Sequence, residues 1–314
     1  MACSLLLKAV SYRYRDKAAL HQLTAKISGK AITALLGPNG SGKSTLFNIL
    51  ATHLPLQEGE ATLELHDRPA VSLRPPLQPW RAVLGVVFQN PSLDKKLTVL
   101  ENMRYHAWLF GIKDSIFLQR SRFLLDALKI QDYAHAKVET LSGGIARRAE
   151  IAKTLLAQPR LLLLDEPSTG LDPIARRDLM DLLRRLVSEE KILVFMTTHF
   201  TDEAEQADQV LILDQGHLVA NGAPSELKKS CPFHVIRVEG DFPSKFVMQF
   251  SESFRYRFQH HPRHLRIECP IDEDPEGLAR WIRQTLDGTS HSITISPPTL
   301  EDVFFKMTGH TFTV

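Results

Sequence analysis

One short stretch, residues 37–45, constrains the fold of this chain more than any other part of it. The stretch reads G-P-N-G-S-G-K-S-T and fits the pattern G-x-x-x-x-G-K-[ST] of a phosphate-binding P-loop. An apolar run at residues 31–36 predicts a strand before it, and the apolar spacing at residues 45–50 predicts a helix after it. Strand, glycine-rich loop and helix in this order predict an α/β fold with the loop at the end of a buried strand.

The residue types of this loop suit a triphosphate, which concentrates negative charge in a small volume. Gly37, Gly40 and Gly42 let main-chain N–H groups approach the phosphates, and the following helix contributes its positive dipole end. Lys43 supplies a compact charge for the β- and γ-phosphates, and the Ser44 hydroxyl can bind Mg²⁺. The residues predicted to bind the nucleotide are Gly37, Pro38, Asn39, Gly40, Ser41, Gly42, Lys43, Ser44 and Thr45.

Length, charge and cysteine content narrow the class of protein. At 314 residues the chain exceeds one typical domain, so we expect one large and one small domain. A net charge of +2 argues against a general nucleic-acid binder, which would carry a strong basic bias. Cys3, Cys231 and Cys269 lie far apart without a C-x-x-C, which argues against a disulfide framework and indicates a reducing compartment.

The sequence predicts neither a membrane span nor a signal peptide. The purely aliphatic runs, such as residues 161–164, are far shorter than the roughly 20 residues that a transmembrane helix needs. Residues 1–8 lack the charged segment and the apolar segment of a secretory signal. Any role at a membrane is therefore expected to depend on a partner protein.

A second strong signal is the apolar run at residues 161–164, which ends in Asp165 and Glu166. A continuously apolar strand indicates burial on both faces, as in a parallel sheet. Two carboxylates at the end of such a strand are costly unless a cation or a substrate uses them. Downstream of a P-loop, Asp165 is predicted to hold Mg²⁺ and Glu166 to act as general base on the attacking water. The alternative is a pair of solvated loop carboxylates.

Three further side chains are candidates for the same site. Tyr12 or Tyr14, just before the core, could stack on adenine, or could be an ordinary strand tyrosine. Gln89, at the end of the apolar strand 84–89, could reach the metal and the attacking water, although a lone amide there also suits a surface position. His199 follows another buried strand and can both donate and accept a proton near neutral pH.

A second anion-binding helix start is predicted at residues 141–148, L-S-G-G-I-A-R-R. Ser142 is a good N-cap, and Gly143 and Gly144 leave the N–H groups of the helix accessible. The same residues could instead be a flexible helix entry.

Local signals predict several elements around these sites. Thr98 and Glu101 form a capping box that opens a helix, and the pattern stays helical to about residue 131. Residues 74–80, with three prolines, are expected to be loop, and Asp172 followed by Pro173 is expected to start a helix. The residues expected to share one buried helix face are Phe117, Leu118, Phe123, Leu124, Leu125 and Leu128.

Taken together and in order, these motifs resemble the ATP-binding-cassette (ABC) ATPases across residues 4–229. The order is the P-loop, Gln89, the signature 141–144, Asp165 with Glu166, the loop 168–172, and His199. The resemblance implies a RecA-like P-loop NTPase core with an antiparallel β subdomain and a helical subdomain at about residues 90–160. The nucleotide-binding domain would then span residues 1–229.

The resemblance also implies roles for individual residues. ATP would lie in a head-to-tail homodimer, between the P-loop of one copy and Ser142, Gly143 and Gly144 of the other. Tyr14 matches the aromatic residue that stacks on adenine in the family. Ile145 stands where many members carry Gln, which puts one ribose contact in question but not the phosphate contacts. The residues implied in hydrolysis are Glu166, His199, Gln89 and Lys43, and those implied in binding Mg²⁺ are Ser44, Gln89 and Asp165.

The tail, residues 230–314, is predicted to be a small α+β domain. Strands are expected at residues 233–238, 256–260, 264–269 and 290–296, and helices at 244–250, 275–286 and 300–307. This order suits a ferredoxin-like split β-α-β fold. His260, His261 and His264 cluster here, but adjacent strand residues point to opposite faces, so a metal site is not expected.

Two stretches resemble one branch of the family, the ABC-2 exporters of drugs, polysaccharides and lipids. They are residues 90–98, N-P-S-L-D-K-K-L-T, and residues 297–304, P-P-T-L-E-D-V-F. We therefore expect the ATPase subunit of an exporter, bound to a separate integral membrane permease on the cytoplasmic (inner) face of the plasma membrane. The sequence names no transported substrate.

Two other classes of function compete with this hypothesis. A soluble ABC ATPase acting on DNA or ribosomes would usually carry long coiled coils or two cassettes, and its charge would be more basic. A regulatory ATP-binding module without turnover would not need Glu166 and His199, which are both present.

Overall fold

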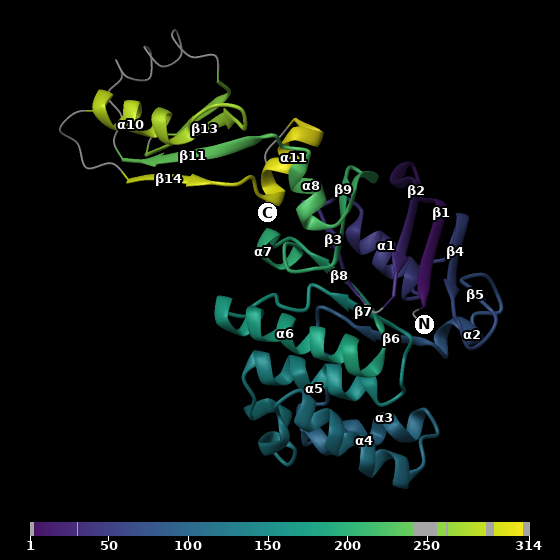
Figure 1. Ribbon diagram of the computed structural model, residues 1–314. Coiled ribbons are helices and arrows are strands. Elements are labelled where there is room, and N and C mark those ends of the chain that lie inside the picture. The colour runs from purple at the N-terminus through teal and green to yellow at the C-terminus, as the bar shows by residue number, and fades with distance from the viewer. Residues whose placement is uncertain (1–2, 30, 241–255, 262, 287–291, 310–314) are drawn as a thin grey trace. The chain divides into compact units, whose positions relative to one another are not determined.

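The computed structural model describes residues 3–29, 31–240, 256–261, 263–286 and 292–309, and it divides into two compact units, Met1–Pro224 and Ser225–Thr311 (Figure 1). The second unit begins within a short helix, α8 (Pro224–Lys229), so this division falls slightly before the predicted boundary at residue 229. Among the described residues, no helix combines the length and the apolar content needed to cross a membrane. All three cysteines are buried and free.

The first unit contains two sheets. An antiparallel sheet has the strand order β2-β1-β4-β5, and a larger sheet has the order β10-β9-β3-β8-β7-β6, in which only β10 is antiparallel to its neighbour. The strands are β1 (Ser4–Tyr14), β2 (Lys17–Ser28), β3 (Ile32–Leu36), β4 (Glu58–Glu64), β5 (Val71–Ser72), β6 (Leu84–Val87), β7 (Leu161–Asp165), β8 (Leu193–Thr198), β9 (Gln209–Asp214) and β10 (His217–Gly222).

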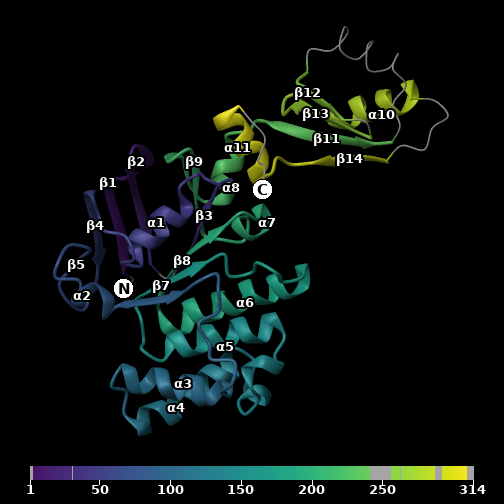
Figure 2. The same cartoon turned by 180° about the vertical axis from the view of Figure 1, so that it is seen from behind.

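Helices cover the parallel sheet and form a separate layer beyond it (Figures 1 and 2). Helices α3, α4 and α5 pack on one another, and α5 also packs on β6. The helices are α1 (Lys43–Leu50), α2 (Gln78–Arg81), α3 (Val99–Leu109), α4 (Asp114–Ala127), α5 (Gly143–Leu155), α6 (Pro173–Glu190) and α7 (Thr201–Ala204), with 3-10 turns at Gln131–Tyr133 and Val138–Thr140.

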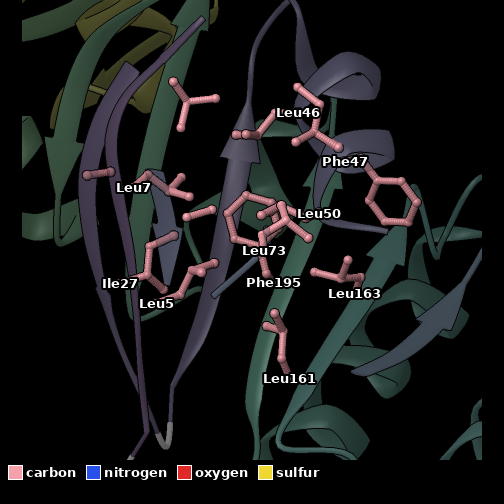
Figure 3. Close-up of a cluster of buried hydrophobic side chains, with 14 of the residues drawn as sticks. Leu5, Leu7, Ile27, Leu46, Phe47, Leu50, Leu73, Leu161, Leu163 and Phe195 are labelled. Carbon is pink, nitrogen blue, oxygen red and sulfur yellow. The ribbon is translucent and has the colours of Figure 1, made fainter. Parts of the chain in front are cut away.

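The core of the first unit lies between the two sheets, around α1. Every residue of β3 and β8 is buried, as are the first four of β7, which is why these strands read as continuous apolar runs. Figure 3 shows leucines of β1 and α1 meeting Phe195 of β8 and Leu161 and Leu163 of β7. Burial of this apolar surface stabilises the packing of the strand that carries the P-loop.

The helix predicted from residue 98 to about 131 is wrong in one respect, because the structure divides it into α3 and α4. Gly111 between them has a φ of 65°, which ends the first helix in a left-handed turn. The capping box of Thr98 and Glu101 is confirmed at the start of α3.

The predicted buried face of this helical segment is also partly wrong. Four of its six apolar residues are buried, but Leu118 and Phe123 are 58% and 40% exposed. Each lies next in sequence to a buried residue, so the helical rotation turns it off the packed face.

The stretch 74–80, predicted to be loop, contains the start of the short helix α2. Pro79 occupies the first turn of this helix, where its missing N–H is tolerated. Trp80 in the same turn is fully buried, and its indole Nε1 donates a hydrogen bond to the Leu50 carbonyl at 2.8 Å. This contact joins α2 to the end of α1.

The second unit has the predicted ferredoxin-like topology in its described part. Its strand order is β12-β13-β11-β14 with every neighbouring pair antiparallel, as the split β-α-β arrangement requires. The elements are β11 (Phe233–Glu239), β12 (Phe258–His261), β13 (His264–Pro270), α10 (Pro275–Thr285), β14 (Ser292–Ser296) and α11 (Leu300–Thr308). The predicted helix at 244–250 lies outside the described residues, as do the side chains of His260 and His261.

Candidate functional site

The carboxyl ends of four parallel strands meet at one edge of the large sheet. Strand β3 leads into the P-loop, β8 into His199, β7 ends at Asp165, and β6 leads towards Gln89. The register places Leu36 beside Thr198 and Asp165 beside Thr197, so residues far apart in sequence become neighbours. Ligands of open α/β sheets bind at such an edge.

The P-loop curls tightly at the end of β3. Gly42 has a φ of 106°, and a Cβ there would lie 2.7 Å from the Ala19 carbonyl oxygen. A Cβ on Gly37 would lie 2.4 Å from the Leu213 carbonyl oxygen and 2.6 Å from Ser41 Oγ. Glycine is therefore required at both positions, the first for its backbone conformation and the second for its lack of a side chain.

The Lys43 ammonium lies inside this loop. It donates hydrogen bonds to the carbonyl oxygens of Gly37 at 2.6 Å and Pro38 at 3.0 Å. Burial lowers the pKa of Lys43, and the carboxylates of Glu166 and Asp165 oppose this shift. The two hydrogen bonds thus hold the amino group within the loop, where a phosphate would enter.

The other polar groups of the loop differ in exposure. Asn39, Gly40 and Ser44 are exposed, whereas Thr45 is buried. Ser41 is also buried, and its Oγ has no hydrogen-bond partner among the described residues. A ligand in the loop could supply the missing partner to this hydroxyl.

Thr197 organises the two carboxylates at the end of β7. Its hydroxyl donates to Asp165 Oδ1 at 2.6 Å and accepts from the Glu166 main-chain N–H at 2.9 Å. Glu166 has a φ of 42°, a left-handed conformation that is uncommon for a non-glycine residue. Burial raises the pKa of Asp165, while the Thr197 hydrogen bond acts in the opposite direction. The two carboxylates therefore have different partners although they are adjacent in the sequence.

Gln89, Glu166 and His199 come together beside this turn. Gln89 Nε2 donates to Glu166 Oε2 at 3.2 Å, and His199 Nδ1 lies 3.3 Å from Glu166 Oε1. Thr169 Oγ1 also donates to Glu166 Oε2, at 3.1 Å. The structure thus brings together three residues that each follow a different strand, β6, β7 or β8, although Gln89 and His199 lie 110 positions apart in the sequence.

Glu203 is a site residue that the sequence analysis missed. It is buried in α7 and accepts hydrogen bonds from Thr198 Oγ1 at 2.6 Å and from Ser168 Oγ. Burial raises the pKa of its carboxyl group, and the two hydroxyl donors oppose the shift. Glu203 therefore connects the loop after Glu166 to the residue before His199. In the sequence, Glu203 lies four residues after His199, and this spacing matches no known metal-binding or nucleotide-binding pattern.

The remaining predicted residues lie on other elements. The Ser142 hydroxyl accepts from the Ile145 N–H at 3.4 Å, so Ser142 caps α5 as predicted. Gly143 has open space where a Cβ would be. Tyr14 is 46% exposed at the end of β1 and meets Tyr12 edge-on, with ring centroids 4.8 Å apart. Tyr12 is buried, so only Tyr14 presents an open ring.

In the parallel sheet, one strand separates the P-loop strand β3 from β7, which ends in the acidic pair. Together with an amide and an imidazole on the second carboxylate, this arrangement is that of a nucleoside-triphosphate hydrolase. The family model described as ABC transporter matches residues 20–169. The Nod factor export ATP-binding protein I of Rhizobium etli is 32% identical over 305 residues, covering 96% of this chain and 92% of that protein. The daunorubicin/doxorubicin resistance ATP-binding protein DrrA of Streptomyces peucetius is 33% identical, covering 95% and 90%.

A solved structure with the same fold is cbiO1 from Clostridium perfringens, part of the ABC transporter complex cbiONQ. Its TM-score is 0.65 at 29% identity, covering 71% of this chain and 89% of that one. The chain belongs to the ATP-binding-cassette family and is an ATPase subunit of an ABC transporter. The ABC resemblance seen in the motifs is thereby confirmed.

Proposed function

We propose that this chain hydrolyses ATP at the carboxyl edge of its parallel sheet with Glu166 as general base. The observation that carries this assignment is the contact of the Glu166 carboxylate with Gln89 at 3.2 Å and His199 at 3.3 Å. A carboxylate can take the proton of the attacking water, while an amide and an imidazole can orient that water and the γ-phosphate. Lys43 would then donate to the β- and γ-phosphates from the position it already occupies.

Mg²⁺ fits the oxygen donors at this edge. They are the exposed Ser44 hydroxyl, the Asp165 carboxylate and the side-chain amide oxygen of Gln89, and such hard donors suit Mg²⁺. A bound cation would favour the ionised form of Asp165, whose pKa burial raises. When bound, Mg²⁺ would neutralise part of the charge on the β- and γ-phosphates.

A homodimer would complete the site. The Ser142-Gly143-Gly144 turn is open to solvent at the N-terminus of α5, a helix long enough to present a positive dipole end. Each turn would face the ATP that the P-loop of the other copy holds, with Tyr14 stacking on adenine. This arrangement uses the two anion-binding helix starts of one chain on two different nucleotides.

The partner would be a separate integral membrane permease. A groove of about 330 Å³ lies between α3, α5 and β6, and Phe110, His106 and Lys153 help to line it. The neighbouring α3 exposes the large apolar side chains of Tyr105, Trp108 and Leu109. Such a patch on a globular protein favours protein contact. The relative named for Nod factor export supports export, with this chain on the cytoplasmic face of the membrane, where ATP is available.

The test measures phosphate release by the purified chain with MgATP, with ATP plus EDTA, and with no nucleotide. We expect turnover only with MgATP, and an increase in molar mass to that of a dimer when ATP is added. Hydrolysis that survives EDTA would contradict the role of Mg²⁺. A chain that stays monomeric with ATP bound would contradict the sandwich.

A further inference from the structure

Helix α5 carries three charged residues on one buried face. Arg147, Glu150 and Lys153 follow one another at a spacing of three, and each is at most 8% exposed. Burying three charges is costly unless each is paired and hydrogen-bonded. The proposed phosphate chemistry does not require these three buried charges. Their hydrogen-bond partners therefore indicate what they do.

The first partner is the loop that carries Gln89. Arg147 Nη1 donates to the Phe88 carbonyl oxygen at 2.6 Å, and Nη2 donates to the Gln89 carbonyl oxygen at 2.8 Å. The planar guanidinium thus holds two consecutive main-chain carbonyls at once, which the single ammonium of lysine could not reproduce with the same geometry. These two residues directly follow the end of β6.

The far end of the same loop is held as well. Glu150 Oε1 accepts from the Ser92 main-chain N–H at 2.6 Å and from its hydroxyl at 2.8 Å. Lys153 Nζ donates to Ser92 Oγ at 2.7 Å and to the Ser92 carbonyl oxygen at 3.1 Å. Glu150 Oε2 accepts from Arg147 Nη1 at 3.0 Å, which links the two ends. Loop residues 88–92 are therefore fastened to α5 at both ends.

We propose that Arg147 is a positioning residue for ATP hydrolysis, because it fixes the main chain of Gln89 so that its amide meets Glu166. The inference rests on the proposed function of Gln89 and Glu166. Arg147 itself touches neither the carboxylate nor the nucleotide-binding loop in any contact found among the described residues. It acts through the Gln89 carbonyl, two bonds from the Cα that bears the amide side chain.

The same contact links the N-terminal part of α5 to the Gln89 loop. The helix begins at Ser142, whose turn would face the ATP of the second copy, and one turn later Arg147 holds Gln89. A displacement of α5 would carry Gln89 with it. Gln89 would therefore contact Glu166 correctly only when α5 is seated, which makes Arg147 the physical connection between the signature turn and the base of its own chain.

The experiment is a double-mutant cycle of Arg147→Met and Gln89→Ala, with kcat and KM for ATP measured on the full chain. Arg147→Met should lower kcat by about ten- to a hundredfold, because a misplaced group costs rate rather than affinity. ATP affinity, measured by titration with a fluorescent analogue, should stay within about twofold. Adding Gln89→Ala to Arg147→Met should lower kcat no further, since both changes remove one interaction.

Arg120→Met is the matched control for a loss of packing alone. Arg120 is 14% exposed, donates to the Leu155 carbonyl at 2.9 Å and pairs with Glu190 at 3.0 Å, so it resembles Arg147 without touching the Gln89 loop. We expect Arg120→Met to lower the thermal midpoint Tm about as much as Arg147→Met does, and to leave kcat unchanged. Arg147→Lys covers the case in which the methionine variant fails to fold. It keeps a charge beside Glu150 but cannot hold both carbonyls with the same geometry, so its kcat should lie above that of Arg147→Met and still more than about twofold below that of wild type.

Two outcomes would overturn the proposal. One is a kcat within about twofold of wild type in a folded Arg147 variant, and the other is a pair of losses that multiply in the double variant. A failure of the proposed function is detected by a different variant. If Glu166→Gln hydrolysed ATP as fast as wild type, Glu166 would not be the general base, whatever the result for Arg147. In that case the role inferred for Arg147 would also be wrong, because it depends on the contact between Gln89 and Glu166.

Discussion

Single residues at the strand ends carry the chemistry proposed for this ATPase. Asp165 and Glu166 are neighbours in sequence, yet a left-handed φ of 42° at Glu166 and the Thr197 hydroxyl give them different surroundings. Asp165 accepts a hydrogen bond from the Thr197 hydroxyl, and its carboxylate oxygens suit a cation ligand. Glu166 meets Gln89 and His199, which suits a base. Two carboxylates with different environments can take different roles.

Glu166→Gln should keep ATP binding and lose most turnover. The amide has the shape of the carboxylate but is a poor base, so kcat should fall by about a hundredfold or more. The variant should also accumulate as an ATP-bound dimer, because the nucleotide is not consumed. Phosphate release and size-exclusion chromatography with light scattering give the two readings. Turnover at the wild-type rate would refute the role of Glu166.

Lys43→Ala should weaken nucleotide binding itself. The substitution removes the charge that is proposed to face the β- and γ-phosphates, and also the hydrogen bonds to Gly37 and Pro38. Titration with a fluorescent ATP analogue measures the effect. Lys113→Ala, at an exposed position before α4, is the control for loss of a positive charge. Equal affinities for these two variants would mean that the P-loop is not the binding site.

At the scale of elements, two roles of the N-terminus of α5 can be tested separately: the capping of the helix and the proposed contact with ATP. Ser142 stabilises the helix by capping it, since its hydroxyl accepts from the Ile145 N–H. The same turn, with Gly143 open on its outer side, is proposed to face the γ-phosphate of the second copy. Loss of the Ser142 hydroxyl tests the capping role, and a larger side chain at residue 142 tests the proposed contact with ATP.

Ser142→Arg should leave each chain able to bind ATP and should abolish hydrolysis by the homodimer. A guanidinium is too large for a closed interface, although its charge alone would suit phosphate. Ser142→Ala is the control, because it loses only the cap, at a cost of about 1 kcal/mol in the free energy of unfolding. Phosphate release with both purified variants measures the difference. Normal hydrolysis by Ser142→Arg would show that this turn is an ordinary helix entry.

A mixed dimer of Ser142→Arg and Lys43→Ala chains examines the same arrangement in trans. Both lesions fall at one of its two sites, and the other site keeps an intact P-loop facing an intact signature turn. Activity above that of either variant alone is expected if the two sites work independently. Absence of recovery would instead indicate that the sites are strictly coupled.

At the scale of the whole molecule, the chain is proposed to act across a membrane through a separate permease. The groove between α3, α5 and β6 is the proposed contact, and Phe110 is 53% exposed at its rim. The ferredoxin-like unit carries its own core, in which Ile236, Ile267 and Ile282 are fully buried between its sheet and α10. It is therefore a compact unit with a hydrophobic core of its own.

Phe110→Glu should leave the ATPase activity of the isolated chain unchanged and weaken its association with the permease. A carboxylate at the rim would have to be desolvated on contact, which costs binding free energy. Co-purification with the permease from detergent-solubilised membranes measures the association. Phe123→Glu adds the same charge at a similarly exposed aromatic position on α4, outside the lining of the groove. Equal co-purification of both variants with the permease would place the contact elsewhere.

Local signals in the sequence predicted the central strands and the helix caps, but they missed the break between α3 and α4 and the start of α2. Continuous apolar runs gave β3, β7 and β8, because strands buried on both faces have no polar position. The caps at Thr98, Ser142 and Asp172 were predictable because a cap bonds to N–H groups two or three residues away. Such interactions are encoded within one helical turn. The order of motifs then indicated the family, which the relatives confirm.

Tertiary structure alone decided which strand ends meet. The sheet order β3-β8-β7-β6 does not follow the chain, and so the contacts of Thr197, Glu203 and Arg147 with distant loops have no local signal. The exposure of Leu118 and Phe123 likewise depends on where α4 packs rather than on their apolar character. The physical reason is the same in each case. A buried hydroxyl, carboxylate or guanidinium is stabilised by whichever groups the fold brings beside it, and sequence spacing does not specify those groups.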